Sequence, residues 1–317
     1  MAGYIPASAQ DTKLSTYNYN PLFLNPAHTG NFYGNWRAAI SYRNQWKATG
    51  DAFTTAVAAV DVPMQFRNHN YGLGLLLVDD YSKNITRDKI ALSASYFYKL
   101  SDNFFSGGLQ VGYVSNTSGN ANWRNYNPLT DKPDLPSGEP GAMAEPGYID
   151  LDLGIIWRRT FGKLEPEVGV SFSHLNQPNQ SFYGATEKVP VNTTLHGLVK
   201  ANLNDEIYVL PTFLISSNNS NTLTILGAQA GYRLLGNRSS LKEVFGGLTV
   251  RNGISSPLSD ISMLIGATVG RLDVALSYDI NVTGMSQSAN VSTFEISLIY
   301  KSISTVLNSY SIPCERF

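Results

Sequence analysis

The sequence contains little cysteine and little charge, and neither sign of charge dominates. Its single cysteine, Cys314, excludes an internal disulfide and any metal site built from several cysteines. Only 15% of the 317 residues are charged, whereas soluble globular domains usually contain roughly 25%. The net charge of -1 gives no support for nucleic-acid binding, so we expect no nucleic-acid partner.

Long apolar runs are missing as well. The most apolar piece, GLGLLLV at 72–78, is far shorter than the roughly 18 residues that a transmembrane helix needs. Only helices and closed β-barrels satisfy the hydrogen-bonding groups of the backbone in lipid. If this chain lies in a membrane, it must therefore cross it as a β-barrel.

Aromatic residues and polar connecting segments are abundant instead. The chain contains 18 Tyr, 14 Phe and 4 Trp, and its connecting segments are rich in Asn, Ser and Gly. A membrane β-barrel needs this balance, because aromatic residues favour strands and few charges can face lipid.

The clearest strand pattern lies near the end of the chain, in RLDVALSYDINV (271–282) and TFEISLIYK (293–301). In both runs apolar residues alternate with residues that are small, polar or charged, and in the second run Ile299 is the one exception. Because the side chains of a strand point alternately to two faces, each run has an apolar face and a polar face. A soluble sandwich also alternates, but runs of about ten residues with aromatic ends and a charged polar face are typical of membrane barrels.

About fourteen strand-like runs follow one another along the chain. Connectors after even-numbered runs are mostly tight, such as 99–102 and 160–162, and those after odd-numbered runs are mostly longer. The longer connectors are 46–52, 80–86, 115–148, 174–191, 252–260 and 283–292. The runs are 36–45, 53–62, 70–79, 87–98, 103–114, 149–159, 163–173, 192–203, 206–215, 223–233, 242–251, 261–269, 271–282 and 293–302.

Tight turns on one side and long loops on the other are expected of an outer-membrane barrel with both termini in the periplasm. We therefore predict an all-β protein: a transmembrane antiparallel outer-membrane β-barrel of about 14 strands over residues 36–302. The N-terminal segment and the C-terminal tail would lie on the periplasmic side. We find no repeat with a period of 20–50 residues, so a propeller or solenoid is disfavoured.

Three segments flank this predicted barrel. Residues 1–9 end in Ala-Ser-Ala before Gln10, which resembles a signal-peptide cleavage site and predicts export; an ordinary N-terminal extension is the alternative. Residues 10–35 contain two Asn-Pro pairs, which favour turns. We expect this segment to pack at the barrel mouth or in the lumen, although a loose leader fits the pattern too. Residues 303–317 would form a periplasmic tail.

The residues suggest neither a catalytic set nor a metal site. His28, His69, His174 and His196 are scattered without ligand spacing, and neither a nucleophile elbow nor a phosphate-binding loop occurs. We therefore predict no enzyme activity and no cofactor.

Polar residues at alternate strand positions are expected to face the lumen. Because they carry both signs of charge, they favour a packed lumen over an ion-selective pore of one sign. They are Arg37, Arg43, Asp152, Arg158, His196, Lys200, Asp273, Asp279 and Glu295.

Several stretches together resemble the PorP/SprF family of the type IX secretion system of Bacteroidota, over nearly the whole chain. In this family the chain usually ends in Cys-Pro-Arg-Phe, and here Glu315 replaces the proline. The matching stretches are NPLFLNPAHTG (20–30), SYRNQW with AFTT (41–55), YGLGLLLVDD (71–80), SFYG with VPVNTTLHG (181–197), SYDINVTG (277–284), FEISLIY (294–300) and CERF (314–317).

The resemblance implies an outer-membrane barrel without enzymatic activity that works with secretion and gliding-motility machinery. One branch of the family holds the C-terminal domain of a large secreted adhesin at the cell surface, and we favour this role. Another branch joins the periplasmic ring through a peptidoglycan-binding lipoprotein. A passive channel is the third reading. For the first role, loops 115–148 and 174–191 would dock the partner together with the N-terminal segment, with anchors at Trp123, Tyr126, Phe182 and Tyr183.

Overall fold

The structure, a computed structural model, describes most of the predicted barrel. The described residues are 12–45, 53–67, 69–82, 85–118, 126–127, 132–133, 147–180, 188–219, 221–235, 240–253, 258–282 and 292–303.

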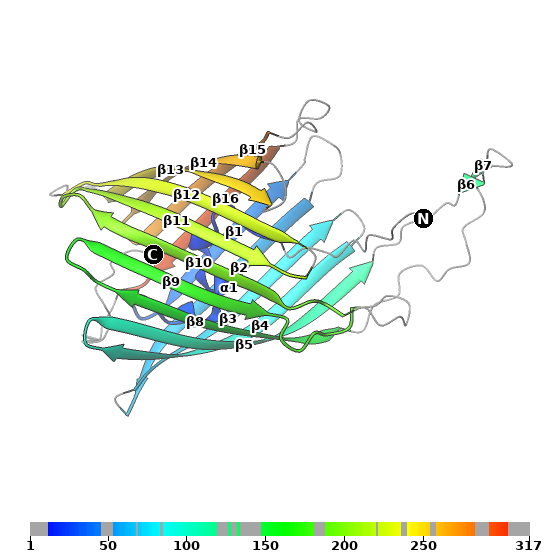
Figure 1. Ribbon diagram of the computed structural model, residues 1–317, viewed down its shortest axis with the longest axis horizontal. Helices are drawn as coiled ribbons and strands as arrows, with labels where there is room; N and C mark the ends of the chain where they lie inside the picture. The colour runs from blue at the N-terminus through cyan, green and yellow to red at the C-terminus, as the bar shows by residue number, and fades with distance from the viewer. Residues whose placement is uncertain are drawn as a thin grey trace.

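Fourteen antiparallel strands form a closed barrel, in which β16 pairs with β1 (Figure 1). Each run predicted from the sequence corresponds to one of these strands, so the predicted barrel is confirmed. The strands are β1 (Arg37–Gln45), β2 (Phe53–Phe66), β3 (His69–Ser82), β4 (Ile85–Leu100), β5 (Asn103–Ser118), β8 (Tyr148–Arg159), β9 (Leu164–Ser173), β10 (Asn192–Asn202), β11 (Ile207–Ser217), β12 (Thr222–Arg233), β13 (Leu241–Gly253), β14 (Leu258–Val269), β15 (Leu272–Asn281) and β16 (Ser292–Lys301). A separate pair, β6 (Tyr126–Asn127) and β7 (Lys132–Pro133), lies outside the barrel sheet.

The two faces of the barrel wall differ in chemistry, as the alternation predicts. On β15, Tyr278 and Ile280 are 48% and 42% exposed, whereas Ser277 and Asp279 beside them are buried. An apolar outer face over a buried polar inner face is the arrangement of a barrel surrounded by lipid.

The outer face of β3 shows the height of the apolar band. Tyr71 and Tyr81 are both exposed, and Leu73 and Leu77 lie exposed between them. At roughly 3.3 Å per residue and a strand tilt of about 40°, the stretch from one tyrosine to the other spans about 25 Å, which suits an outer membrane with aromatic residues at both interfaces.

Several connectors are shorter than the sequence predicts, and two of them show why. β3 continues to Ser82 and β4 begins at Ile85, so most of the predicted connector 80–86 is strand. Likewise, β13 ends at Gly253 and β14 begins at Leu258. Backbone pairing continues beyond the apolar band, where both faces of a strand meet water and hydropathy no longer alternates.

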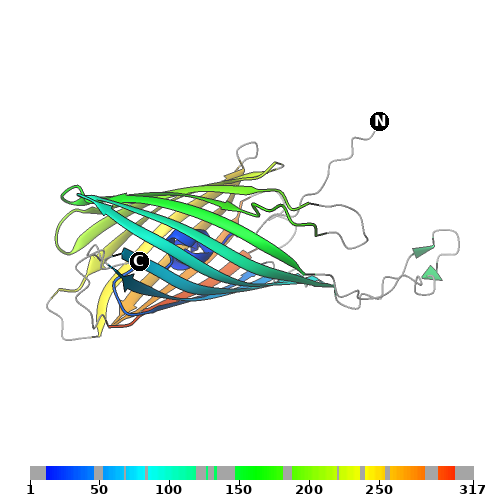
Figure 2. The same ribbon diagram turned by 90° about the horizontal axis from the view of Figure 1, so that it is seen from below.

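The described residues ahead of β1, 12–36, lie largely inside the barrel, and we call them the plug. Its short helical turns are η1 (Tyr17–Tyr19), α1 (Pro21–Leu24) and η2 (Pro26–His28). Figure 2 shows these blue turns enclosed by the strands. Among the described residues, no helix is long and apolar enough to span a membrane.

The plug runs from one mouth of the barrel to the other. The long-loop mouth carries the connectors 119–147 and 174–191, and the short-turn mouth carries 101–102 and 270–271. Thr12 binds Asp80, two residues from the long-loop end of β3. At the other mouth, the backbone N–H of Trp36 donates to Ser302 Oγ at 2.9 Å.

This course does not confirm one expectation. The sequence predicts that the N-terminal segment and the C-terminal tail lie on the same, periplasmic side. In the structure Thr12 lies at the long-loop mouth, whereas Ile303, which follows β16, lies at the short-turn mouth. The topology rule fixes where the first strand begins, and β1 does begin at the short-turn mouth. The rule does not fix the direction of the chain that precedes β1.

Candidate functional site

The start of the plug is bound by buried charged groups near the long-loop mouth. Glu295 accepts hydrogen bonds from the backbone N–H groups of Ser15 and Thr16, at 2.9 and 2.8 Å, and from the Thr16 hydroxyl. Arg43 lies 3.2 Å from Glu295 and 3.4 Å from Asp279, and it donates to Ser15 Oγ at 2.8 Å. All five residues are buried. Each carboxylate therefore has a cationic partner, which buried carboxylates need in order to stay charged.

Asn25 fixes the middle of the plug to three strands. Its Nδ2 group contacts the carbonyl oxygens of Ile155 and Val170 at 3.4 and 3.2 Å, and His196 Nε2 at 3.0 Å. Its Oδ1 accepts a hydrogen bond from the backbone N–H of Ala27, which caps η2. These contacts set which end of the amide is oxygen and which is nitrogen, and they join β8, β9 and β10 through one side chain.

Glycines on the inner face let the plug approach the strand backbone closely. At four of them, an added Cβ would lie only 1.8 to 2.7 Å from a plug atom, closer than van der Waals contact allows. These glycines form a track under residues 22–29 of the plug: Gly72 and Gly74 on β3, Gly108 on β5 and Gly154 on β8. The wall is therefore shaped for this segment of backbone.

Serine hydroxyls beside the glycine track bind the carbonyl groups of the plug. Buried carbonyls need such partners, because α1 and η2 are too short to satisfy their own. The contacts are Ser95 Oγ to Thr29 O at 2.6 Å, Ser106 Oγ to Ala27 O at 2.6 Å, and Ser171 Oγ to Leu24 O at 3.1 Å.

A buried ion pair holds the plug just before it leaves the lumen. Arg37 binds both oxygens of Asp61, at 3.0 and 2.7 Å, and it also donates to the carbonyl oxygen of His28 at 3.0 Å. Asp61 Oδ2 accepts the backbone N–H of Gly30 at 2.6 Å. Gly30 has φ of +67°, a conformation that favours glycine, so the chain turns here towards β1.

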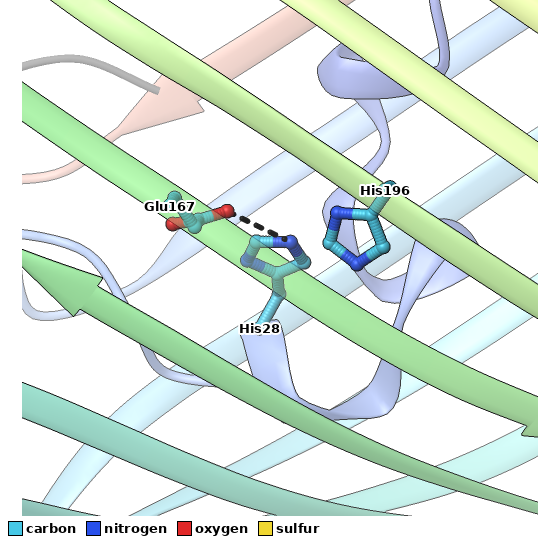
Figure 3. A group of neighbouring side chains, drawn as sticks. All are labelled: His28, Glu167 and His196. Atoms are coloured by element: carbon cyan, nitrogen blue, oxygen red, sulfur yellow. Dashed lines mark ion pairs between the residues drawn. The ribbon is translucent and has the colours of Figure 1, made fainter.

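Two histidines and a glutamate meet where η2 touches the wall (Figure 3). His28 Nε2 lies 3.5 Å from Glu167 Oε1, and the rings of His28 and His196 are 5.6 Å apart. Burial lowers the pKa of His28, a plug residue outside the strands, to about 3, and the neighbouring Glu167 carboxylate opposes this shift without cancelling it. His28 is therefore neutral at physiological pH.

This cluster has metal-ligand residue types, but its hydrogen bonds favour a purely structural role. Asn25 Nδ2 donates a hydrogen bond to the lone pair of His196 Nε2, so the neutral ring carries its proton on Nδ1. In this arrangement neither ring nitrogen has a lone pair free for a metal. Arg158 already pairs with Glu167 through its Nε at 2.8 Å and through Nη2. A divalent cation would add charge beside this guanidinium. We therefore interpret the cluster as a hydrogen-bonded link between plug and wall.

A second polar cluster lies near the long-loop mouth. Lys89 Nζ is 2.7 Å from both Asp150 and Asp152, where it occupies the position that a cation would take. His174 donates its backbone N–H to Asp152 Oδ1 at 3.1 Å, and its Nδ1 lies 2.7 Å from Asp150. The group ties the start of the connector 174–191 to β4 and β8.

The plug does not fill the lumen completely. A cavity remains between η1 and the wall formed by β10 to β16. Its lining mixes aromatic and charged side chains, among them Tyr19, Lys200, Tyr208, Glu243 and Phe245. Tyr19 stacks on Phe245 with ring centroids 5.9 Å apart.

The nine residues expected to face the lumen take part in these contacts to different degrees. Arg37, Arg43, Arg158, His196, Asp279 and Glu295 belong to the groups that bind the plug, and Asp152 belongs to the second cluster. Lys200 is buried at the cavity, with its Nζ 5.2 Å from the Tyr208 ring centroid. Asp273 is half-buried and pairs with Lys301 at 3.0 Å.

The proposed partner anchors are not tested by these contacts. Trp123, Phe182 and Tyr183 lie outside the described residues. Tyr126 opens β6, which pairs with β7, and its side chain is likewise outside the description.

Sequence reasoning missed the partners that complete the lumen. Asp61 and Glu167 are not among the residues predicted to face the lumen, and Asn25 is predicted only as part of an Asn-Pro turn, although each makes several of the contacts above. Asp61 could have been found by pairing the first two predicted strands as a hairpin, because it lies directly opposite Arg37 in the β1–β2 register. The glycine track had no such signal, since its members come from three strands.

Together, the closed sheet, the apolar outer face and the inserted segment define a plugged outer-membrane β-barrel. Solved structures share the fold: the toluene transporter TbuX of Ralstonia pickettii has a TM-score of 0.54 at 9% identity, over 89% of this chain and 92% of that one. The toluene transporter TodX of Pseudomonas putida has a TM-score of 0.52 at 10% identity, over 92% and 93%. The monoaromatic hydrocarbon channel CymD has a TM-score of 0.53 at 10% identity, over 90% and 93%. At these identities the likeness concerns the fold alone.

The sequence itself identifies the family. Residues 7–300 match the family described as type IX secretion system membrane protein PorP/SprF, and the chain belongs to that family. A search of curated proteins by sequence found no match. The protein is thus a membrane β-barrel of the type IX secretion system.

Proposed function

We propose that this barrel is a non-enzymatic scaffold that holds a large secreted adhesin at the cell surface through the adhesin's C-terminal domain. The observation that supports a scaffold is the bound plug. Residues 12–36 occupy the lumen and bind the wall through buried ion pairs, serine hydroxyls and the glycine track. A lumen bound in this way suits a rigid frame for loops better than an open conduit.

The proposed orientation follows from the loops. Outer-membrane barrels place short turns in the periplasm and longer loops outside, so the long-loop mouth would face the exterior. Export through a cleaved signal peptide at residues 1–9 belongs to the same proposal. The docking surface would be the two long connectors, with Trp123, Tyr126, Phe182 and Tyr183 as aromatic anchors.

The experiment that tests this role is a pull-down of the tagged protein from its native outer membrane in mild detergent, with mass spectrometry. We expect one very large secreted protein in stoichiometric amounts. Recovery of periplasmic ring components with a peptidoglycan-binding lipoprotein would instead support the machine-associated role. Recovery of the barrel alone would contradict both roles.

Replacing Trp123 and Phe182 with alanine should release the partner and leave the barrel folded. Aromatic anchors at the centre of an interface typically contribute about 2 kcal/mol or more each, so the doubly substituted protein should retain little partner in the pull-down. Tyr113→Ala, an exposed position on the outer face of β5, is the control. Unchanged recovery with the double variant would show that these loops are not the anchor.

A passive channel is the second candidate, and the cavity beside η1 is the observation that favours it. The similar folds of TbuX and TodX belong to proteins described as toluene transporters. Ion conductance in a planar bilayer distinguishes the two functions. The scaffold predicts a closed barrel with at most a small leak, and the channel predicts steady conductance without any substitution.

A further inference from the structure

The cavity beside η1 lies towards the short-turn mouth of the barrel. Every wall residue that lines it is within four residues of the short-turn end of its strand, from Lys200 on β10 to Ile299 on β16. On the plug, Tyr19 lines the cavity, and Tyr17 packs against the wall farther towards the long-loop mouth, at Leu214. The plug therefore covers the cavity from the long-loop side, and the short-turn mouth is its nearer opening.

Aromatic rings from both the plug and the wall line this cavity. Tyr19 of the plug stacks on Phe245 of β13, and Tyr208 of β11 lines the same space. Aromatic side chains favour a further ring in offset or edge-to-face contact. The cavity has a volume of about 50 Å³, several times the roughly 10–15 Å³ that one water molecule needs. It therefore has room for a group larger than a single water molecule.

The two carboxylates of the lining are each close to a cationic group of the wall. Asp273 pairs with Lys301 at 3.0 Å. Glu243 accepts a hydrogen bond from the Tyr208 hydroxyl at 2.7 Å and lies 4.0 Å from Arg233. Because the wall supplies these cationic groups, the carboxylates do not call for a positively charged ligand.

Lys200 adds a further positive charge to the lining. Its side chain is buried, and its Nζ lies 5.2 Å from the centroid of the Tyr208 ring. The described charged groups that line the cavity or pair with its lining are then three cations, Lys200, Arg233 and Lys301, and two carboxylates, Glu243 and Asp273. A ligand with one negative charge balances this set, and buried charges are stabilised by such balance.

We propose that this cavity binds a small aromatic carboxylate, which enters from the short-turn mouth. The Lys200 ammonium binds the carboxylate, and the ring packs among Tyr208, Tyr19 and Phe245. The site goes beyond the scaffold role, and it does not depend on which side of the membrane the short-turn mouth faces. Because Tyr19 belongs to the plug, a bound ligand contacts plug and wall together and stabilises the seated plug.

Isothermal titration calorimetry on the purified, folded barrel in detergent micelles tests the proposal, with phenylacetate as the probe. Phenylacetamide keeps the ring and lacks the charge, and cyclohexylacetate keeps the charge and lacks the aromatic ring. We expect saturable binding of one phenylacetate per barrel. Phenylacetamide should bind about tenfold more weakly, because it loses the charge-assisted hydrogen bond, and cyclohexylacetate about threefold more weakly, because it loses the aromatic contacts.

Substitutions at two lysines of the same mouth locate the site. Lys200→Met removes the buried charge and keeps an unbranched side chain, so the affinity for phenylacetate should fall about tenfold while that for phenylacetamide stays unchanged. Lys200→Arg retains the charge and should bind phenylacetate. Lys242→Met is the matched control, because Lys242 is exposed beside Glu243 on β13, and it should bind as the wild type does. Heat-modifiable migration in gels shows that each variant is folded.

Three results would overturn the proposal. The first is the absence of saturable phenylacetate binding by the wild-type barrel, and the second is equal affinity for phenylacetate and phenylacetamide. The third is an equal loss of affinity in Lys200→Met and Lys242→Met, which would show a long-range effect of charge without a site. If Lys200→Met does not fold, the comparison of the three probes on the wild-type barrel still decides the matter.

Discussion

Replacing Gly108 with valine should unseat the plug and turn the closed barrel into an ion-conducting one. An added Cβ at this position would lie 2.4 Å from the carbonyl carbon and oxygen of Pro26 and 2.5 Å from the backbone nitrogen of Ala27. These are backbone atoms of η2, so no side-chain rotation relieves the clash. Overpacking of this kind typically costs about 1–3 kcal/mol, and sometimes more.

The clash acts on the plug rather than on the wall. Gly108 lies on β5, whose backbone is paired with both neighbouring strands, whereas η2 is three residues long and depends on side-chain contacts. Ser106, two residues along the same strand, holds the Ala27 carbonyl and would lose that bond. The weaker partner should move, and moving it removes the obstruction in the lumen.

Gly107 provides a matched control one residue away. An added Cβ there meets no atom within 4 Å, because the position points out of the barrel. Gly107→Val should therefore remain closed, while Gly108→Val conducts in planar bilayers and both variants keep heat-modifiable migration. If Gly108→Val does not fold, Gly108→Ala introduces the same Cβ with less bulk. A folded variant at Gly108 with the wild-type conductance would contradict the prediction.

The strands could be predicted because each one carries its own signal. Lipid on one side and a polar lumen on the other impose period two on residues such as Tyr278 and Asp279, whatever the neighbouring strand contains. The ends of β3 and β4 at the long-loop mouth were missed because the alternation of apolar and polar residues stops where both faces of a strand meet water. The backbone there still pairs, as between Asp80 and Arg87.

The plug could be suspected but not placed. Its turns follow from two Asn-Pro pairs, yet its contacts depend on glycines and serines from several strands. Gly108 and Gly154 are 46 positions apart in the sequence, and they become neighbours only through the pairing of β5 with β8. The sequence around each of these glycines does not distinguish it from a glycine that only weakens its strand.

The charged residues illustrate the same limit. Arg43 and Glu295 were expected to face the lumen, and they are separated by 252 positions. The register of the closing strands places them directly opposite each other. Their pairing is a property of barrel closure, so it could be derived only after the number and order of strands were known.

Removing one member of the Arg43–Glu295 pair should lower the free energy of unfolding of the barrel strongly. Glu295→Ala removes the acceptor of the backbone N–H groups of Ser15 and Thr16 and the carboxylate beside Arg43. Arg251 also binds this part of the plug, because its guanidinium donates to Ser15 Oγ at 3.0 Å. Breaking one side of a buried pair typically costs about 3–5 kcal/mol, and here the buried Arg43 would keep only Asp279, at 3.4 Å, as a partner for its charge. The free energy of unfolding in urea, measured in lipid vesicles, should fall by that amount.

A control variant tests whether the loss of stability comes from removing a buried partner or from removing any glutamate. Glu206, in an exposed turn, accepts a hydrogen bond from the Tyr232 hydroxyl, and Glu206→Ala should change the free energy of unfolding by less than about 0.5 kcal/mol. If burial of unpaired charge is the cause, replacing both members, with Arg43→Met added to Glu295→Met, should recover part of the loss, since apolar groups of similar volume often substitute for a buried pair. A double variant as unstable as Glu295→Ala would instead show that the bonds to Ser15 and Thr16, and so the seating of the plug, carry the energy of this group.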